Sequence, residues 1–375
     1  MTKHADLGAS KAHRFTKCTA SVKLEKDMPD VKNKYALDGI RLHEIATEVI
    51  INDSANLLNE LSVEDKYIIN CYKSFFDEIL NSISKFDGEI CDVYCERLVD
   101  YSIINNCGSS LTTFGTADCI ITSKTSKTIH VIDLKTGSGV VKAYENQQLL
   151  LYAIGAYVEF SNFIEIENIK LHIVQPKINN FDTWELSASE MMSKWLPFFQ
   201  RTVKEINEGG VFRPALDTCK YCKAKAKCPA LFNIMKKKIE MDEDLFLKDE
   251  DLKEVLDNAE LVELFIKSVK ELVYEMLINN KEFKGYKLVK GKTVRKLNED
   301  KIKSNAFILQ RDFNLEVEDC YEKKLKTLSS FEKMVGKQNV TDFVDLVESE
   351  PVMVKEEDTR ELWSKLKLNN NSKIN

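Results

Sequence analysis

An apolar run that ends in charged residues sets the fold of this chain: Thr128-Ile129-His130-Val131-Ile132-Asp133-Leu134-Lys135. Side chains alternate along a β-strand, so Asp133 and Lys135 project from the same face. A second acid, Asp118, lies upstream in Gly115-Thr116-Ala117-Asp118. Two carboxylates beside an ammonium group can hold a divalent cation and a phosphate oxygen together. The Asp-X-Lys motif by itself is common by chance. It is equally consistent with an ion pair that is exposed to solvent in a turn.

The composition is that of a soluble globular protein of one or two domains. The 375 residues are 43% hydrophobic and 30% charged, and no apolar stretch approaches the roughly 18–20 residues that span a bilayer. The N-terminus lacks the pattern of a secretory signal, so we expect a cytoplasmic protein without membrane contact. Ten cysteines in such a chain are expected to be thiols or metal ligands. The net charge of −6 gives no overall basic surface, although cations can be concentrated locally.

Hydrophobic periodicity predicts an α/β (α+β) fold, with a mixed sheet flanked by helices. Helical periodicity covers 38–50, 63–84, 144–158 and 187–208, and strand patterns cover 91–100, 117–123, 128–135 and 168–175. On the first helix, His43 lies at the edge of the apolar stripe, whereas Glu44 faces away. The predicted order is helix, three strands, helix, strand, helix.

The chain changes character after Cys228, which predicts a first domain over 1–232 and a charged, mainly helical region over 233–375. Residues 284–296 alternate like a β-hairpin and carry six cations without an acid. Such a hairpin could follow a DNA backbone, and a solvated hairpin in a lysine-rich protein is an equally good interpretation. The cations considered for DNA contact there are Lys287, Lys290, Lys292 and Arg295.

Three further polar residues are candidates for the same site. His43 can add a nitrogen ligand for an ion such as Mn²⁺, although a histidine at the rim of an apolar helix face more often packs. Gln148 and Tyr152 recur with Tyr144 at helical spacing. They could orient phosphate oxygens or a carboxylate, or they could be ordinary polar neighbours of an amphipathic core helix.

Taken together, these motifs resemble the RecB-like branch of the PD-(D/E)XK nucleases. The matching motifs, in order, are Gly39-x-x-x-His43, Gly115-x-x-Asp118, Asp133-x-Lys135 and Gln148-x-x-x-Tyr152, within about residues 1–230. The resemblance implies a restriction-endonuclease-like core. It also implies that His43, Asp118, Asp133 and the backbone carbonyl of Leu134 bind Mg²⁺ or Mn²⁺. Asp118, Asp133 and Lys135 are then catalytic, and Gln148 and Tyr152 support the site.

Four cysteines form a second motif. Cys219, Cys222 and Cys228 follow a C-x2-C-x5-C spacing, and a zinc or iron–sulfur centre needs a fourth ligand, for which Cys18 is the best candidate. The interleaved lysines, including Lys220 and Lys223, are expected to lower the thiol pKa values and could contact DNA. The arrangement resembles the [4Fe–4S] cluster of AddB-type helicase–nucleases and of CRISPR-associated nucleases of this branch. Zinc is the alternative occupant.

The overall layout resembles an uncharacterised family of phage and prophage proteins attributed to this branch. It implies a metal-dependent deoxyribonuclease, an exonuclease acting on DNA ends or single strands in phage DNA replication or recombination. The host cytoplasm would be its location. A phage single-strand-binding, annealing or helicase protein would be a candidate partner. The rival interpretation is a non-cleaving DNA-binding module for recombination or assembly that retains the fold.

Overall fold

The computed structural model of the chain describes residues 5–26, 28, 34–52, 54–87, 91–239, 249–321, 325–336, 339–349, 351–355 and 358–363. The chain separates into two compact units, Met1–Ile266 and Lys267–Asn375. This division falls inside helix α10 (Asp249–Ile278), later than the predicted boundary between 232 and 233. Phe265 of α10 packs against Phe232 of α9 (Pro229–Ile239), with ring centroids 6.4 Å apart, so the first part of α10 belongs with the first unit.

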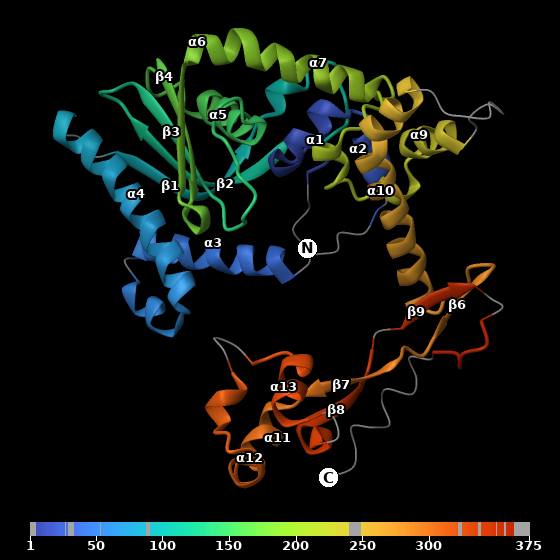
Figure 1. Cartoon of the computed structure of the whole chain (residues 1–375). Helices are drawn as coiled ribbons and strands as arrows, with labels where there is room; N and C mark the ends of the chain where they lie inside the picture. Colours follow the sequence, from blue (N-terminus) through green and yellow to red (C-terminus); the bar gives the residue numbers. More distant parts are fainter. Residues whose placement is uncertain are drawn as a thin grey trace. The chain divides into compact units, whose positions relative to one another are not determined.

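A five-stranded mixed sheet forms the centre of the first unit (Figure 1). Across the sheet its strands are β1 (Asp92–Asp100), β2 (Phe114–Ser123), β3 (Thr128–Leu134), β4 (Asn168–Gln175) and β5 (Asn180–Ser187). Neighbouring strands are antiparallel except β3 and β4, which are parallel. β3 is buried along its whole length, as expected of a strand covered on both faces. The predicted mixed sheet is confirmed.

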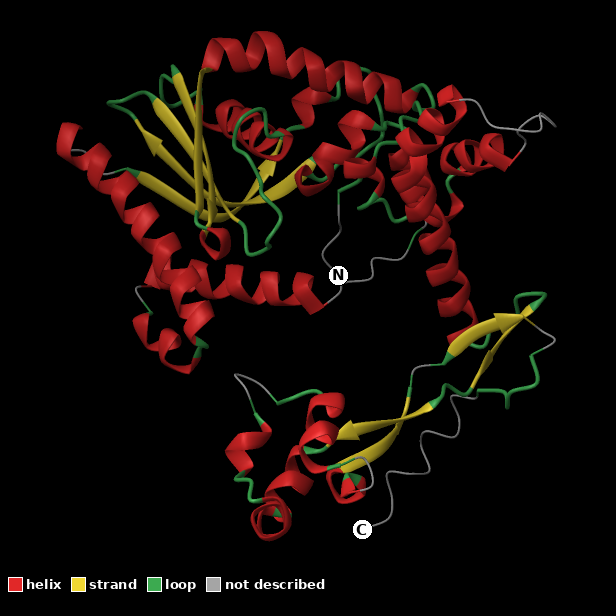
Figure 2. Ribbon diagram, viewed as in Figure 1, coloured by secondary structure: helices red, strands yellow, loops and turns green. Residues whose placement is uncertain are grey.

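Helices cover both faces of this sheet (Figure 2). On one face, α3 (Lys34–Asn52) and α4 (Val63–Asp87) bury their apolar side chains against β2 and β3. On the other face, α5 (Gln147–Phe160) packs on the second side of the same strands, and α7 (Leu196–Asn207) buries its apolar side chains in the same core. None of the helices in the described ranges is long and apolar enough to cross a lipid bilayer.

Two predicted helices differ from the structure at their ends. The helix expected over 144–158 begins only at Gln147, because the Asn146 side chain accepts hydrogen bonds from the next turn's backbone N–H groups and caps it. Tyr144 therefore precedes α5 and does not share its face with Gln148. The helix expected over 187–208 is divided into α6 (Ala188–Glu190), a π-helical turn (Met191–Trp195) and α7.

The sequence patterns do not predict strand β5. It returns antiparallel to β4 after a short turn in which Asn179 adopts a left-handed conformation with φ of 52°. Its residues alternate between exposed and half-buried, and Asp182 and Glu185 interrupt the apolar pattern. An edge strand buries only one face, so its periodicity is weaker than that of the central strands.

The N-terminal segment packs against the chain that follows α7. It contains α1 (Ala12–Lys17) and α2 (Ser21–Glu25), and α8 (Leu216–Cys219) lies beyond α7. The backbone N–H of Val211 donates to the Thr19 hydroxyl at 2.7 Å, and the N–H of Ala20 donates to the Val211 carbonyl at 3.3 Å. These bonds hold the residue after Cys18 close to the segment that leads to Cys219.

The second unit has its own apolar core and contains strands as well as helices. Beyond α10, its elements are β6 (Tyr286–Val289), β7 (Thr293–Leu297), α11 (Glu299–Ser304), α12 (Ala306–Phe313), α13 (Leu328–Val335), β8 (Val344–Glu348) and β9 (Val352–Lys355). The predicted hairpin over 284–296 is wrong. β6 pairs with β9 and β7 pairs with β8, so both strands exist but their partners come from the far end of the unit.

Short 3-10 helices lie before and between the elements named above. They lie at Ala9–Lys11, Ala55–Glu60, Ser102–Ile104, Pro176–Ile178, Lys225–Lys227, Val317–Cys320 and Thr341–Phe343. The first of these leads into α1 and buries Ala9 in the same core as α5.

Candidate functional site

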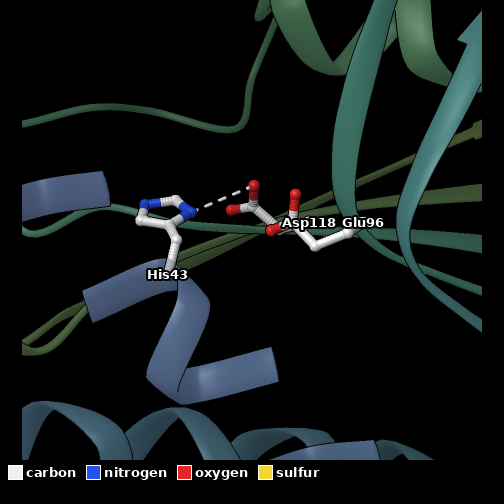
Figure 3. Close-up of side chains that lie close together, drawn as sticks. All are labelled: His43, Glu96 and Asp118. Carbon is white, nitrogen blue, oxygen red and sulfur yellow. Dashed lines mark ion pairs between the residues drawn. The ribbon is translucent and has the colours of Figure 1, made fainter. Parts of the chain in front are cut away.

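Three side chains from three elements converge beside the C-terminal end of β3 (Figure 3). They are His43 of α3, Glu96 of β1 and Asp118 of β2. The Nδ1 atom of His43 lies 3.2 Å from Oδ1 of Asp118, and one ligand atom from each of the three residues lies within 4.8 Å of the others. Leu42, beside His43, is buried against the sheet, which directs the imidazole to the site while Glu44 is exposed to solvent.

The sequence motifs do not single out Glu96. Its backbone has a φ of 47°, although the flanking pairs with β2, Cys95 with Cys119 and Arg97 with Ala117, keep a regular register. A positive φ is unfavourable for a non-glycine residue within a strand and often marks a functional position. That register places Glu96 opposite Asp118. The only sequence signal is an acid inside the predicted strand 91–100, and Asp92 and Asp100 share that signal.

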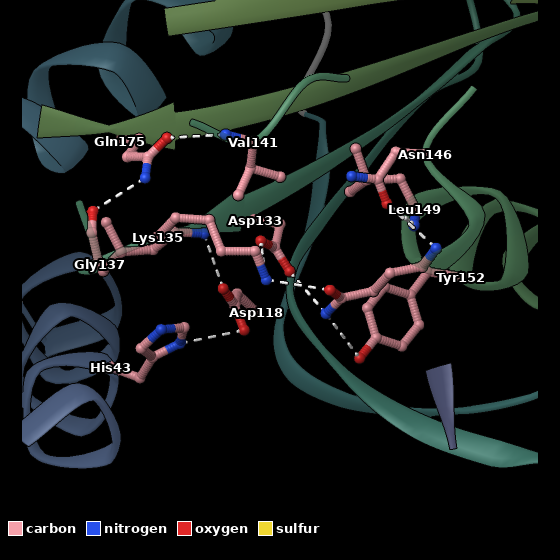
Figure 4. Close-up of polar contacts among 12 residues, drawn as sticks. His43, Asp118, Asp133, Lys135, Gly137, Val141, Asn146, Leu149, Tyr152 and Gln175 are labelled. Atoms are coloured by element: carbon pink, nitrogen blue, oxygen red, sulfur yellow. Dashed lines mark hydrogen bonds and ion pairs between the residues drawn. The ribbon is translucent and has the colours of Figure 1, made fainter. Parts of the chain in front are cut away.

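Asp133, Lys135 and Gln148 form the second half of the site (Figure 4). Lys135 Nζ lies 2.7 Å from Asp133 Oδ2, which confirms that the two side chains share a face. Gln148 of α5 joins both: its Nε2 donates to Asp133 Oδ1 at 2.9 Å, and its Oε1 accepts from Lys135 Nζ at 2.9 Å. The amide therefore holds the acid and the ammonium group in one fixed arrangement.

Asp118 connects the two halves. Its Oδ2 atom accepts a hydrogen bond of 2.8 Å from the backbone N–H of Leu134, while its Oδ1 faces His43. Cys119 pairs with Ile132 in the β2–β3 ladder, and one further step in this register sets Asp118 opposite Asp133. Residues opposite each other in an antiparallel pair point to the same face. The two aspartates thus lie side by side, as the motif spacing predicts.

Tyr152 closes the site on the α5 side. Its hydroxyl lies 3.5 Å from Gln148 Nε2. Burial raises the pKa of Tyr152, with a further contribution from the Asp133 carboxylate, so the phenol stays protonated. A Cβ atom added at Gly115 would come within 3.0 Å of the Tyr152 ring and 3.3 Å of Ala9. The glycine of the Gly115-x-x-Asp118 motif therefore makes room for this ring.

The electrostatics of the site favour an added positive charge. Burial raises the pKa of Asp133 to about 6, and the neighbouring Asp118 carboxylate acts in the same direction. Burial alone would lower the pKa of Lys135, but Asp133 and Asp118 together raise it. Burial likewise opposes protonation of His43, yet its hydrogen bond to Asp118 raises the pKa above the usual value. Several carboxylates thus compete for few cations in a desolvated place.

These residues fit a hard divalent cation. Desolvation and Asp118 raise the pKa of Glu96, as expected when carboxylates are held together without a metal. Asp133 is 2% exposed, and its Oδ2 atom lies 2.7 Å from the Lys135 ammonium, so one cation already meets this buried carboxylate. Burial and the Asp118 carboxylate raise the pKa of both Asp133 and Glu96, so a second cation would relieve the remaining repulsion among these acids. Carboxylates with one imidazole suit Mg²⁺ or Mn²⁺.

The four candidate metal-binding cysteines come together in the fold. Cys18, Cys219, Cys222 and Cys228 are all buried thiols and line one small cavity together with Arg14 and other side chains. Cys18 arrives from the end of α1, and the other three lie on the loop around α8. This convergence of segments some 200 residues apart is what a shared metal centre requires.

The interleaved lysines do not lower the pKa of Cys219 or Cys222. Burial raises the pKa of Cys222 to about 12, and the nearby Glu25 carboxylate adds to the effect. Burial also raises the pKa of Cys219. Lys220 and Lys223 are exposed, and Lys220 Nζ lies over the Tyr221 ring, 5.6 Å from its centroid, so water screens their charges from the buried sulfur atoms. The expectation of lowered pKa values is therefore wrong for Cys219 and Cys222, and a bound metal is what would stabilise their thiolates.

The cations considered for DNA contact lie in both units. Lys220 and Lys223 are in the first unit, on the loop that carries Cys219, Cys222 and Cys228, called the cysteine loop below. In the second unit, Lys287 and Arg295 are half-buried and Lys292 is exposed. Lys290 Nζ lies 3.1 Å from Glu361 Oε2, and Arg295 forms an ion pair with Glu332. Their contact with DNA stays a prediction.

Comparison with known proteins places the chain in a family. Among solved structures, one titled "Crystal structure of SSO0001" is 14% identical and covers 61% of this chain and 89% of that chain, with a TM-score of 0.31. A likeness this low bears on neither the fold nor the function. A protein-family model described as "Protein of unknown function (DUF2800)" matches residues 4–361. Because this match spans nearly the whole chain, the protein belongs to the DUF2800 family.

Proposed function

We propose that the protein is a Mg²⁺- or Mn²⁺-dependent deoxyribonuclease with a PD-(D/E)XK core of the RecB-like branch, acting on DNA ends or single strands. One observation carries the proposal. His43, Glu96 and Asp118 converge beside a buried Asp133 whose Oδ2 atom lies 2.7 Å from the Lys135 ammonium. A cluster of acids beside a positioned ammonium group is the arrangement that phosphodiester hydrolysis needs.

Each residue has a defined role in this proposal. His43, Glu96, Asp118 and Asp133 would hold the cation, with the Leu134 carbonyl as the motif implies. The bound cation supplies Lewis-acid polarisation of the phosphate and lowers the pKa of water. Lys135 neutralises negative charge that develops on the phosphate, and Gln148 orients its ammonium group through Oε1. Gln148 also restrains Asp133, so loss of this amide would disturb both groups.

We further propose that Cys18, Cys219, Cys222 and Cys228 bind a [4Fe–4S] cluster, with zinc as the alternative. Hydrolysis requires no electron transfer, so the centre would serve to join the N-terminal segment to the loop around α8. Metal analysis of protein purified without oxygen separates the two occupants. Iron and inorganic sulfide in equal amounts support the cluster, and one zinc per chain supports the alternative.

A digestion assay tests the nuclease. Linear duplex and single-stranded DNA labelled at one end, and an internally labelled closed circle, are incubated with Mg²⁺, with Mn²⁺ or with EDTA. We expect metal-dependent release of nucleotides from linear DNA and resistance of the closed circle, with the labelled end giving the polarity.

The matched variants are Asp118→Asn and Lys135→Ala, which should abolish release, and Asp92→Asn, an exposed acid of β1 that should leave it intact. DNA that is bound but not cut under every condition would instead establish the non-cleaving module. Full activity of Asp118→Asn would show that the site is elsewhere.

A further inference from the structure

A cavity leads from the candidate site to the cysteine loop. Its volume is about 550 Å³, and it is lined at one end by Lys135 and Gln148 and at the other by Thr218 and Tyr221. This volume lies within the roughly 300–1,000 Å³ of sites that hold small molecules. A cavity of this volume can hold a nucleotide of a single strand.

Two tyrosines stand exposed in this cavity. Tyr144, in the chain before α5, and Tyr221, between Cys219 and Cys222, both line the cavity and are each 62% exposed. Tyr144 is held from behind by Trp184, with ring centroids 5.3 Å apart. Exposed aromatic rings that are held in place are the platforms on which the bases of single strands stack.

The charge of the cavity suits a phosphate backbone. Among its described lining residues, the permanent cations are Arg14, Lys17, Lys135 and Lys142, against two acids, Glu145 and Asp217. Both acids have cationic partners, since Asp217 pairs with Lys17 and Glu145 lies 3.5 Å from Lys194 Nζ. Lys135 and Arg14 have acidic partners as well, Asp133 and Glu25. Lys142, one of these four cations, is exposed to solvent. Its charge is therefore available to a phosphate backbone although the chain as a whole is negative.

The wall that carries Tyr221 is fixed by the N-terminal segment. Arg14 Nη1 donates to the Tyr221 carbonyl at 3.1 Å, and Arg14 Nη2 lies 2.8 Å from Glu25 Oε2. The other Glu25 oxygen accepts the backbone N–H of Lys223 at 2.7 Å. Tyr221 lies between Cys219 and Cys222, so a metal held by these thiols would also fix the ring.

We propose that this cavity is the binding groove for a single strand of DNA, with bases stacked on Tyr144 and Tyr221 and the backbone led toward Lys135. The inference rests on the proposed function and specifies its substrate as single-stranded DNA. The loop that carries Cys219, Cys222 and Cys228 is then one wall of the substrate groove, in addition to binding the metal that joins it to the N-terminal segment.

The test measures binding and cleavage separately. Fluorescence anisotropy gives Kd for a labelled single-stranded oligonucleotide and for its blunt duplex, in Ca²⁺, with strand integrity checked on a gel. The variants are Tyr144→Ala and Tyr221→Ala, their phenylalanine counterparts, and Phe163→Ala, an 82% exposed aromatic outside the cavity. Each alanine variant should raise Kd for the single strand about tenfold, because stacking on a ring is lost. The phenylalanine variants and Phe163→Ala should match the wild type.

Metal content and thermal midpoint of each variant show that the fold is intact. If both alanine variants bind the single strand with the Kd of the wild type, the proposal of a binding groove is wrong, whether or not the wild type cuts DNA in Mn²⁺. An equal rise in Kd for the duplex and for the single strand would also contradict the proposal, because the two rings would then not favour single-stranded DNA. A wild type that never cuts, but whose binding falls in the alanine variants, would overturn the nuclease and leave the groove supported.

Discussion

At the scale of single residues, both halves of the candidate site depend on Asp118. One of its oxygens faces His43 and the other accepts the N–H of Leu134, the neighbour of Asp133. A carboxylate held at both oxygens has lost its rotational freedom in folding, so it need not lose it again on binding a cation. Glu96 is the opposite case, because its carboxylate is exposed and contacts the Thr47 hydroxyl only at 3.5 Å.

Glu96→Gln is expected to weaken metal binding. The substitution keeps the size of the side chain and removes one negative charge from the cluster of His43, Glu96 and Asp118. We expect Kd for Mn²⁺ to rise about tenfold, and isothermal titration calorimetry measures it. Glu44→Gln is the matched control, since Glu44 is an exposed acid that faces away beside His43. Equal Kd values for wild type and Glu96→Gln would remove Glu96 from the ligand set.

At the scale of secondary-structure elements, two buried histidines lie between the sheet and α4. Nδ1 of His130 on β3 lies 3.1 Å from Nε2 of His172 on β4, and Nδ1 of His172 lies 2.9 Å from the Thr183 hydroxyl. Phe75 of α4 packs edge-on against His172, with ring centroids 5.6 Å apart. Neutral imidazoles can satisfy this chain of hydrogen bonds, and protonation would place charge in an apolar layer.

The histidine pair predicts a loss of stability in mild acid. Burial, with Lys170 nearby, lowers the pKa of His130 to about 4, and burial, with His130 beside it, lowers the pKa of His172 to about 3. The unfolded chain, with pKa near 6.5, binds more protons below that pH, so the free energy of unfolding falls as pH drops from 6.5 toward 4. The slope is about 1.4 kcal/mol per pH unit for each proton.

Urea unfolding at pH 7.5, 6.5 and 5.5 measures this slope. His172→Gln removes one of the two titrating groups and should show a shallower fall than the wild type. Comparison of the two proteins cancels the contribution of Asp133, which is present in both. Parallel pH curves for the two proteins would show that His172 does not titrate in this range.

Gly155 sets how closely α5 approaches β1. A Cβ atom added there would lie 2.3 Å from Val99 Cγ1 and 2.7 Å from the Asp100 carbonyl oxygen. Gly155→Ala must therefore push the helix away from the sheet, at an expected cost of about 1–3 kcal/mol in the free energy of unfolding. Gly137→Ala is the control, because nothing lies within 4 Å of its added Cβ. Urea unfolding should give a lower free energy of unfolding for Gly155→Ala than for Gly137→Ala. Equal values would mean that α5 can move away from β1 without cost.

The sequence predicts the buried centre of the fold better than its edges. β3 and α4 are long, strongly patterned and covered by other elements, so periodicity identifies them. β5 is an edge strand whose alternation is weak, and the partners of β6 and β7 come from distant sequence, which periodicity does not contain. The same reason applies to the site. Asp133 and Lys135 meet through local spacing, whereas Glu96 reaches Asp118 only through the register of β1 with β2.

At the scale of the whole molecule, the cysteine cavity joins the start of the chain to the end of the sheet domain. Leu7, Ala9 and Phe15 are buried in the same core as α5, and the Tyr101 hydroxyl donates to the Leu7 carbonyl at 2.9 Å. Closing so long a loop costs only slightly more conformational entropy than closing a short one. A metal bound by Cys18 and the loop around α8 would therefore stabilise the packing of the N-terminal segment onto the core.

Cys18→Ser is expected to release the metal from all four positions. A centre that loses one of four sulfur ligands binds its metal far more weakly, and the three remaining thiols, with the pKa of Cys222 near 12, return to their protonated form. We expect loss of the bound metal and of any brown colour, and a thermal midpoint lowered by several degrees. Cys107→Ser, a thiol outside the cavity, should change neither. Elemental analysis and differential scanning calorimetry measure both quantities, and Lys135→Ala should keep its metal at the cysteines. If Cys18→Ser kept a full complement of metal, the fourth ligand would have to come from another residue, and the N-terminal segment would be held by packing alone.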